Sequence, residues 1–339
     1  MVSKFHFIMK EVLKPSQSMN TLEAVKNFSE QFKYEPVVEN SGGFKPQKYS
    51  RYIFVGMGGS ALAPDLLRVE NPNLDIIIHR DYGLPSLSEE ILKNCLIVVN
   101  SYSGNTEEAL SAFNLAVEKK LSLAAITIGG KLLKLAQENS TPYIQMSDLA
   151  IQPRMALGLN FRALLKIIGE EAALKETDLL AEELTPENYE ADGKEIAEKM
   201  GNATPVIYSS RRNGPLAYVW KVILNETAKI PAFSNVLPEL NHNEMAGFLS
   251  RDLPANYHFV FLKDKEDDRK ILKRMEVAEK LYREQGQSLQ VINLNGKTVC
   301  HKIFSSIILA HWTAYHKALT TGADPDDMAV VEEFKRLMQ

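Results

Sequence analysis

Short apolar runs alternate with longer helical patterns along most of the chain. The first five runs have four or five residues each and lie at 52–55, 75–78, 96–99, 124–128 and 143–146. The helical patterns between them begin near residue 61 and cover 88–93, 107–119 and 131–138. Apolar runs of this length, separated by helices, predict a parallel sheet that is covered on both faces.

A second series of the same kind follows an acidic helical region at 174–199. Its predicted strands lie at 205–208, 258–262 and 289–292, and its predicted helices at 216–229, 266–285 and 300–319. Each half opens with a strand, a loop of small or polar residues and a helix. The pattern predicts an α/β protein with two doubly wound parallel-sheet domains.

Flanking helices complete this arrangement. Residues 1–35 predict an amphipathic leading helix, and 327–338 predict a final helix. We expect residues 1–45 to form the N-terminal helix and linker. The first sheet domain would then span 46–190, and the second, with the C-terminal helix, 191–339.

Composition and charge narrow the class of protein. The chain has 339 residues, 45% of them hydrophobic and 24% charged, which is typical of a globular protein with a full apolar core. Lys and Arg number 39 against 43 Asp and Glu, for a formal charge of −4. This balance argues against a nucleic-acid or membrane partner, so a basic site must be local.

The two cysteines, Cys95 and Cys300, are too few for a metal site or a disulfide framework. We expect buried free thiols and no metal. No stretch reaches the roughly 18 apolar residues of a membrane span, and the N-terminus lacks the pattern of a secretory signal. A cytoplasmic protein is expected.

The segment SYSGNTEE at 101–108 has the chemistry of a phosphate cradle. It follows a predicted buried strand and precedes a helix, whose first N–H groups favour an anion. Ser101, Ser103 and Thr106 offer hydroxyl groups, and Gly104 lets the backbone come close to a ligand. The alternative is that Ser103 or Thr106 simply caps the helix.

A second small-residue loop, GMGGSA at 56–61, lies between the first strand and its helix. It fits the dinucleotide fingerprint G-x-G-x-x-G/A, and Asp81 follows the second strand, so an NAD-binding dehydrogenase is a competing hypothesis. Yet Gly58, Gly59 and Ser60 also make a donor-rich loop. Loops after the first and third strands converge at the switch in strand order, where both would contact one polar ligand such as a phosphosugar.

Arg154 follows the first half within the segment QPRMALG at 152–158. The proline restricts the approach of the chain and places Arg154 at the start of a helix. Its guanidinium could neutralise an oxyanion. The alternative is an ordinary salt bridge near a helix N-terminus.

Two titratable residues stand out in the second half. Glu226 follows Val222 by four residues and Ile223 by three, so helical spacing turns it toward apolar groups, where burial would raise its pKa toward that of a general base. Pairing with Lys229 or Lys221 on a solvated face is the alternative. His242 lies in a polar loop and could transfer a proton near neutral pH, although loop histidines are often surface residues.

Together these segments resemble the sugar isomerase (SIS) family, and within it the bifunctional phosphoglucose/phosphomannose isomerases of the short archaeal and bacterial type. The resemblance covers nearly the whole chain. The order and combination of the matching segments are more specific than any one segment. The segments are GMGGSA at 56–61, SYSGNTEE at 101–108, QPRMALG at 152–158, NETAK at 225–229, ELNHNE at 239–244 and EEFKRLM at 332–338.

The resemblance implies two SIS domains, a homodimer with shared active sites, a sugar 6-phosphate substrate and no metal or nucleotide cofactor. The hydroxyls of Ser60, Ser101, Ser103 and Thr106 would hold the 6-phosphate. Glycines of the two loops would contact the substrate; these are Gly58, Gly59 and Gly104.

For the reaction, the resemblance implies that Glu226 moves a proton between C1 and C2 while Arg154 stabilises the enediolate oxygen. His242, contributed across the dimer interface, and Lys335 on the final helix would assist ring opening. Conversion of an aldose to a ketose needs a carboxylate base and a cation near the oxygens. A phosphosugar-binding protein without catalytic activity is the alternative from another class.

One segment departs from the family pattern. Family members often carry DPTP or a similar run before the last helix, whereas residues 324–328 here read DPDDM. Use of both C2 epimers, glucose 6-phosphate and mannose 6-phosphate, is therefore less securely implied than isomerase activity.

Overall fold

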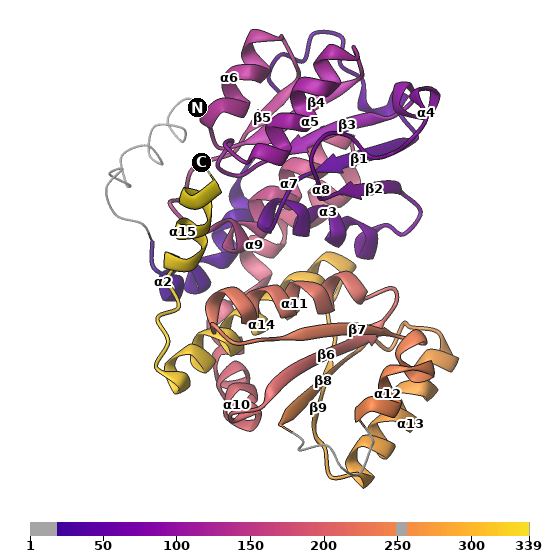
Figure 1. Cartoon of the computed structure of the whole chain (residues 1–339), viewed down its shortest axis with the longest axis vertical. Coiled ribbons are helices and arrows are strands. Elements are labelled where there is room, and N and C mark those ends of the chain that lie inside the picture. Colours follow the sequence, from indigo (N-terminus) through magenta and orange to yellow (C-terminus); the bar gives the residue numbers. More distant parts are fainter. Residues whose placement is uncertain (1–18, 249–255, 339) are drawn as a thin grey trace. The chain divides into compact units, whose positions relative to one another are not determined.

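The computed structural model describes residues 19–248 and 256–338, and these form two compact units (Figure 1). The first contains the described residues up to Pro64 together with Asp75–Lys175. The second contains Asp65–Leu74 and the described residues from Glu176 onward. Each unit is built around its own parallel sheet, as the sequence predicts.

The first sheet has five parallel strands in the order β2-β1-β3-β4-β5. Their bounds are Arg51–Val55 (β1), Asp75–His79 (β2), Leu96–Asn100 (β3), Leu123–Thr127 (β4) and Tyr143–Gln145 (β5). Strands β3 and β4 are buried along their whole length. That burial explains why their sequences are continuous apolar runs and do not alternate between apolar and polar residues.

Helices cover both faces of this sheet. The helices are α3 (Gly59–Glu70), which continues into the second unit, α4 (Glu89–Lys93), α5 (Glu107–Glu118), α6 (Gly130–Glu138) and α7 (Leu157–Ile168). Residues Ala109, Ala112, Phe113 and Ala116 recur at helical spacing on α5 and pack into one core cluster with the sheet. This amphipathic spacing fixes which face of α5 is buried.

The strand order distinguishes between two common kinds of doubly wound α/β fold. Strand β1 lies between β2 and β3, so the order reverses between β1 and β3. The usual dinucleotide-binding order is 3-2-1-4-5-6, whereas this sheet follows the flavodoxin-like order 2-1-3-4-5. The order therefore argues against the dehydrogenase hypothesis and places the loops after β1 and β3 at the switch point.

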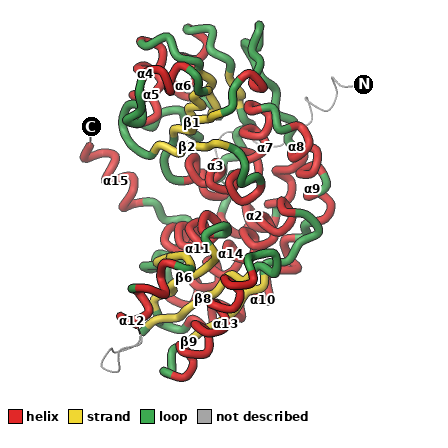
Figure 2. The backbone as a smooth tube through the Cα atoms, turned by 90° about the vertical axis from the view of Figure 1, so that its right-hand side faces the viewer, coloured by secondary structure: helices red, strands yellow, loops and turns green. Residues whose placement is uncertain are grey.

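The second sheet has the order β7-β6-β8-β9, again all parallel. Figure 2 shows β6, β8 and β9 of this sheet side by side. Its strands are Thr204–Ser210 (β6), Phe233–Leu237 (β7), Tyr257–Lys263 (β8) and Ser288–Asn293 (β9). The sequence analysis did not find β7. This edge strand has one buried residue, Leu237, so it lacks the apolar run that identifies the others.

Helices α11 (Gly214–Thr227) and α14 (Val299–Thr321) lie on one side of the second sheet, and α13 (Arg269–Glu284) on the other (Figure 1). Helix α10 (Glu190–Met200) packs against α14. Aromatic rings from β6, β8 and α13 meet in the core, where Tyr208, Phe259 and Tyr282 contact one another.

Two predicted helices are interrupted. Residues 1–18 of the leading helix lie outside the described residues, and the rest forms α2 and a separate 3₁₀ helix that meet at Asn27. The acidic region 174–199 forms three α-helices, since Pro186 cannot continue a helix. The remaining elements are α2 (Thr21–Lys26), η2 (Phe28–Lys33), η3 (Pro46–Lys48), η4 (Pro153–Met155), α8 (Glu171–Asp178), α9 (Leu180–Glu183), η5 (Pro186–Tyr189), η6 (Glu239–His242), α12 (Glu244–Phe248) and α15 (Ala329–Met338).

Both cysteines are buried and free, which confirms the predicted thiols. Burial raises the pKa of each thiol, so neither is activated as a thiolate. Among the described residues, no group of His, Cys, Asp and Glu side chains is arranged to hold a metal ion. None of the described helices combines the length and the apolar character needed to cross a membrane.

Candidate active site

The loops after β1 and β3 are joined through their hydroxyl groups. Ser60 Oγ accepts a 2.9 Å hydrogen bond from the Tyr102 N–H. Ser101 Oγ shares a 2.9 Å hydrogen bond with Thr106 Oγ1 and accepts the Gly104 N–H at 3.2 Å. Ser60 and Ser101 are buried, and Thr106 is half-buried. Ser60 is therefore bonded to the β3 loop, in which Ser101 and Thr106 bond each other, and we call the hydroxyls of these three residues the cradle.

The alternative for Ser103 and Thr106 is that each simply caps the N-terminus of α5. Thr106 is the N-cap residue of α5, but its side chain makes no capping hydrogen bond. Ser103 is exposed, and its Oγ accepts the N–H of Asn105, two residues further on in the loop. The capping explanation is therefore wrong for both residues.

Asn100, at the end of β3, joins the same two loops and was missed by the sequence analysis. It is fully buried, and its Nδ2 donates to Ser60 O at 2.7 Å and to Asn160 Oδ1 at 2.8 Å. A polar residue that ends the apolar run LIVVN was the available signal. Because a buried amide must be satisfied, Asn100 holds the β1 loop in register with the β3 loop.

The glycines of the cradle are required by close packing. At Gly104 the backbone has φ +70°, and an added Cβ would lie 1.8 Å from Gly129 O. At Gly59 a Cβ would lie 2.6 Å from the carbonyl carbon of Pro153. Gly58 also has positive φ, +50°, but open space around it. Loop 56–61 is thereby packed against the segment that carries Arg154.

We expect Gly104→Ala to destabilise the first unit by about 1 to 3 kcal/mol beyond the cost of its backbone conformation, because the new methyl group overlaps a backbone carbonyl. Gly286→Ala is the matched control, since Gly286 has a similar φ of +74° and nothing within 4 Å of its Cβ position. Urea unfolding of both variants measures the difference. Equal losses in the two variants would contradict the packing argument.

Arg154 lies in η4, directly after Pro153, and is only 1% exposed. Its Nη1 donates to Gln152 Oε1 at 3.0 Å. A guanidinium keeps its charge when buried. The structure thus places a buried cation in the segment that packs against the β1 loop, within the same unit as the cradle.

Glu226 lies on the last turn of α11 and is half-exposed. Glu226 is thus half-buried, neither enclosed in the core nor on an open face, and its inward orientation among apolar groups stays a prediction. Lys229 Nζ donates to the Glu226 carbonyl at 2.6 Å and also to the Asp327 carbonyl. This bridge joins the end of α11 to the segment DPDDM that precedes α15.

The loop that contains His242 is anchored on both sides of the histidine. Leu240 is fully buried, and Glu244 Oε1 accepts the hydroxyl of Tyr208 at 2.7 Å, while Asn235 also donates to the Glu244 carboxylate. His242 itself is exposed. The second unit therefore presents this imidazole on its surface.

Lys335 lies on α15, a helix without buried residues, and its Nζ contacts Glu332 Oε1 at 2.7 Å. Glu226, His242 and Lys335 all belong to the second unit, whereas the cradle and Arg154 belong to the first.

The switch point of the second sheet, between β6 and β8, is filled by the protein's own charges. Lys302 Nζ lies 2.9 Å from Asp264 Oδ2 and 2.8 Å from Glu266 Oε2. Ser210 Oγ donates to Asp267 Oδ1 at 2.7 Å, and Asn213 Nδ2 lies 3.3 Å from both aspartates. Carboxylates at this position would repel a phosphate, so the second unit does not repeat the cradle.

Two opposing effects act on the Asp264 carboxyl. Burial would raise its pKa, but hydrogen bonds from the Glu266 N–H and the Lys302 ammonium outweigh burial and lower the pKa. Burial raises the pKa of Asp267. The sequence analysis missed this cluster because its members are far apart in the chain and meet only when β6, β8 and α14 are assembled.

Comparisons with known proteins identify the family of this chain. Residues 189–338 match the family described as the bacterial phospho-glucose isomerase C-terminal SIS domain. A bifunctional phosphoglucose/phosphomannose isomerase of Thermoplasma volcanium is 33% identical over 86% of this chain and 93% of its own length. The corresponding protein of Thermoplasma acidophilum is 30% identical over 95% and 98%.

A solved structure with this fold is the tagatose-6-phosphate ketose/aldose isomerase of Escherichia coli. It has a TM-score of 0.68 at 14% identity and covers 92% of this chain and 96% of its own. The two sheets, with a hydroxyl-lined switch point in the first, define the class of SIS-domain proteins. Within that class, the chain belongs to the family of bifunctional phosphoglucose/phosphomannose isomerases.

Proposed function

We propose that this protein is an aldose–ketose isomerase that interconverts glucose 6-phosphate, and also mannose 6-phosphate, with fructose 6-phosphate. The observation that carries the proposal is the family membership, which extends over 86% of the chain at 33% identity. The cradle supports it, because connected hydroxyls beside a helix N-terminus suit a phosphate.

In this proposal the cradle residues Ser60, Ser101 and Thr106 bind the 6-phosphate together with Ser103 of the same loop. Phosphate binding contributes energy that positions C1 and C2 without taking part in the chemistry. The glycines Gly58, Gly59 and Gly104 belong to the loops that contact the substrate, and Gly59 and Gly104 let these loops pack closely against their neighbours.

The proton transfer is assigned to Glu226, whose half-exposed carboxylate can reach a bound ligand. It would remove the C2 proton of the aldose and return it to C1 through a cis-enediolate. Arg154 supports the negative oxygen of that intermediate, since a buried guanidinium stabilises developing charge strongly. His242 and Lys335 assist opening of the sugar ring.

We further propose a cytoplasmic homodimer in which His242 acts in the partner's active site. The exposure of His242 on an anchored loop supports this arrangement. The domains would extend over 46–190 and 191–339, after an N-terminal helix and linker at 1–45. Neither a metal nor a nucleotide takes part in the proposed reaction.

The direct test is a coupled assay for fructose 6-phosphate formation from each aldose 6-phosphate, with and without a metal chelator. Turnover of both sugars, unchanged by the chelator, is expected. Binding of sugar phosphates without turnover would instead support a phosphosugar-binding protein. Turnover of glucose 6-phosphate alone would contradict the bifunctional assignment and implicate the altered segment at 324–328.

Thr106→Val should raise the KM for fructose 6-phosphate about 10- to 100-fold, because a hydrogen bond to a charged group contributes roughly 1.5 to 3 kcal/mol. The change keeps the side-chain shape and removes the hydroxyl. Thr185→Val is the matched control, since Thr185 is exposed and lies in the second unit. Steady-state kinetics with an unchanged KM in Thr106→Val would remove Thr106 from the phosphate site.

A further inference from the structure

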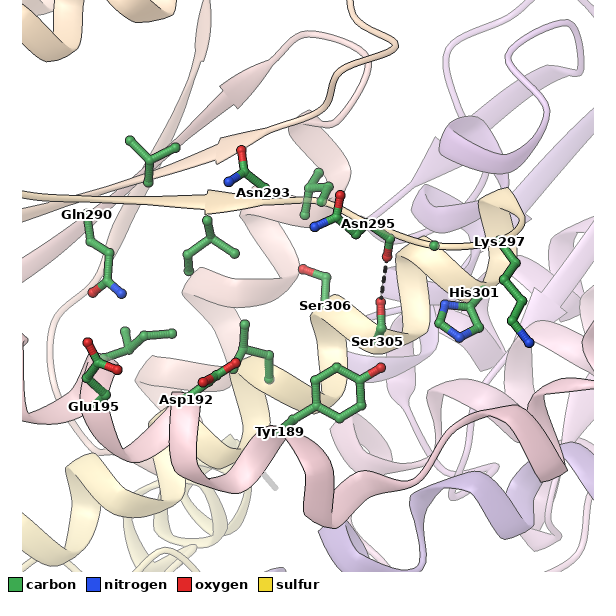
Figure 3. A pocket seen from close by; sticks show the side chains of 16 residues that line it. Tyr189, Asp192, Glu195, Gln290, Asn293, Asn295, Lys297, His301, Ser305 and Ser306 are labelled. Carbon is green, nitrogen blue, oxygen red and sulfur yellow. Dashed lines mark hydrogen bonds between the residues drawn. The ribbon is translucent and has the colours of Figure 1, made fainter.

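A cavity of about 580 Å³ lies within the second unit (Figure 3). Its walls are α10, α14 and strand β9 with the loop that follows it. The volume falls within the range typical of small-molecule sites. The described residues that line it include none of those assigned to the phosphosugar site.

The cavity exists because the second sheet ends one strand earlier than the first. In the first sheet β4 is covered on its outer side by β5. In the second sheet, as far as the chain is described, the order ends at β9, whose outer edge has no strand beside it. Residues 290–297 line the cavity without interruption. Edge strands carry backbone polar groups that need partners.

The lining is rich in groups that hydrogen-bond to hydroxyls. In Figure 3, Gln290 on the strand projects toward the helix that carries Asp192 and Glu195. Further amides, hydroxyls and one aromatic ring belong to Asn293, Asn295, Ser305, Ser306 and Tyr189. The apolar part of the lining consists of Ile196, Val291, Ile292, Leu294 and Leu309.

Two buried atoms of this lining lack a hydrogen-bond partner among the described residues. They are Gln290 Oε1 and His301 Nδ1. A buried polar atom without a partner is energetically unfavourable, so a ligand that supplies the missing hydrogen bond is favoured. Burial lowers the pKa of His301, so its ring is neutral at pH 7 and each nitrogen can be either donor or acceptor. These two side chains lie at opposite ends of the pocket in Figure 3, so separate hydroxyl groups of one ligand could satisfy them, because a hydroxyl donates as well as accepts.

The charge of the lining excludes anions. Lys297 is the one lysine or arginine in it, and its Nζ contacts Glu183 at 2.7 Å. Of the two carboxylates in the lining, Glu195 is paired with Lys199, and Asp192 would face a phosphate with the same sign of charge. We infer that this cavity binds a small uncharged polyhydroxylated molecule, such as an unphosphorylated monosaccharide, at a site separate from the cradle.

The test uses the full chain and D-glucose as the probe, followed by saturation-transfer NMR. Saturating glucose 6-phosphate is present throughout, so that the phosphosugar site is occupied. We expect transfer to glucose to persist, and Gln290→Leu to weaken its binding at least tenfold. Gln285→Leu is the matched control, because Gln285 is exposed at the end of α13 and outside the cavity.

Three results would overturn the inference: no transfer to glucose, transfer that glucose 6-phosphate abolishes, or equal binding by the Gln290→Leu variant. If that variant fails to fold, Asp192→Ala replaces it, since Asp192 is exposed on α10 and its loss should also weaken binding. Unchanged affinity would then contradict the site. Loss of isomerase activity would not bear on it.

Discussion

Glu226→Gln should lower kcat for interconversion of glucose 6-phosphate and fructose 6-phosphate by roughly 10²- to 10⁴-fold, the usual contribution of a positioned general base. The amide keeps the shape of the side chain but cannot accept the substrate proton. Lys229 Nζ donates to the backbone carbonyl of Glu226, so this link between α11 and Asp327 should survive a change of the Glu226 side chain.

Two measurements separate proton transfer from binding. In deuterated water the natural enzyme should exchange the proton of the sugar with solvent, and Glu226→Gln should not. Glucose 6-phosphate should still raise the melting temperature of the variant, since the cradle is intact. Glu284→Gln, an exposed glutamate at the end of α13, is the control and should keep full activity. Ordinary turnover by Glu226→Gln would exclude Glu226 as the base.

Lys302→Met should destabilise the second unit by about 3 to 5 kcal/mol, because it leaves Asp264 as a buried carboxylate without its cation. Lys302 is 4% exposed and Asp264 is 1% exposed, so water cannot replace the lost ammonium. Adding Asp264→Asn should recover part of the loss. Lys280→Met removes an exposed lysine 3.7 Å from Glu284 and should cost less than 1 kcal/mol.

The loss should depend on pH. The pKa of Asp264 is lowered in the folded protein, so its stabilising contribution is present above its ordinary pKa of about 3.9 and disappears as the pH falls through the lower folded value. Urea unfolding should therefore show the largest gap between the natural protein and Lys302→Met near pH 7. A gap that widens toward pH 3 would contradict the role of this ion pair.

The strands that the sequence predicted best are those buried on both faces. β3 and β4 are continuous apolar runs, because a parallel sheet between two layers of helices leaves no polar face. β7 escaped detection since it has one buried residue. The helices also break at Asn27 and Pro186. The periodicity of apolar residues, from which the helices were predicted, does not reveal such breaks.

Some features of the candidate site could likewise be predicted from the sequence, and others could not. Local sequence was sufficient to identify the hydroxyl-rich loops and the glycine at position 104, because strand, loop and helix are neighbours in the chain. The capping alternative and the burial of Glu226 could not be decided from spacing. Both depend on the surroundings of a side chain: Thr106 bonds Ser101 across the loop, and Glu226 is half-buried on the last turn of α11.

The order of residues alone was therefore enough for the α/β class, the two sheets and the family resemblance, since these rest on periodicity and on contiguous motifs. Only the assembled structure showed that Asn100 joins the two cradle loops and that the edge of β9 borders a cavity. It also showed that Lys302 and the carboxylates of Asp264 and Glu266 fill the switch point of the second sheet. The contacts of Asn100 and of Lys302 join residues 36 to 60 positions apart in the sequence. The cavity depends on the order of the strands, because β9 is the edge strand of the described second sheet. Residues this far apart in the sequence come into contact only when the helices and strands pack together.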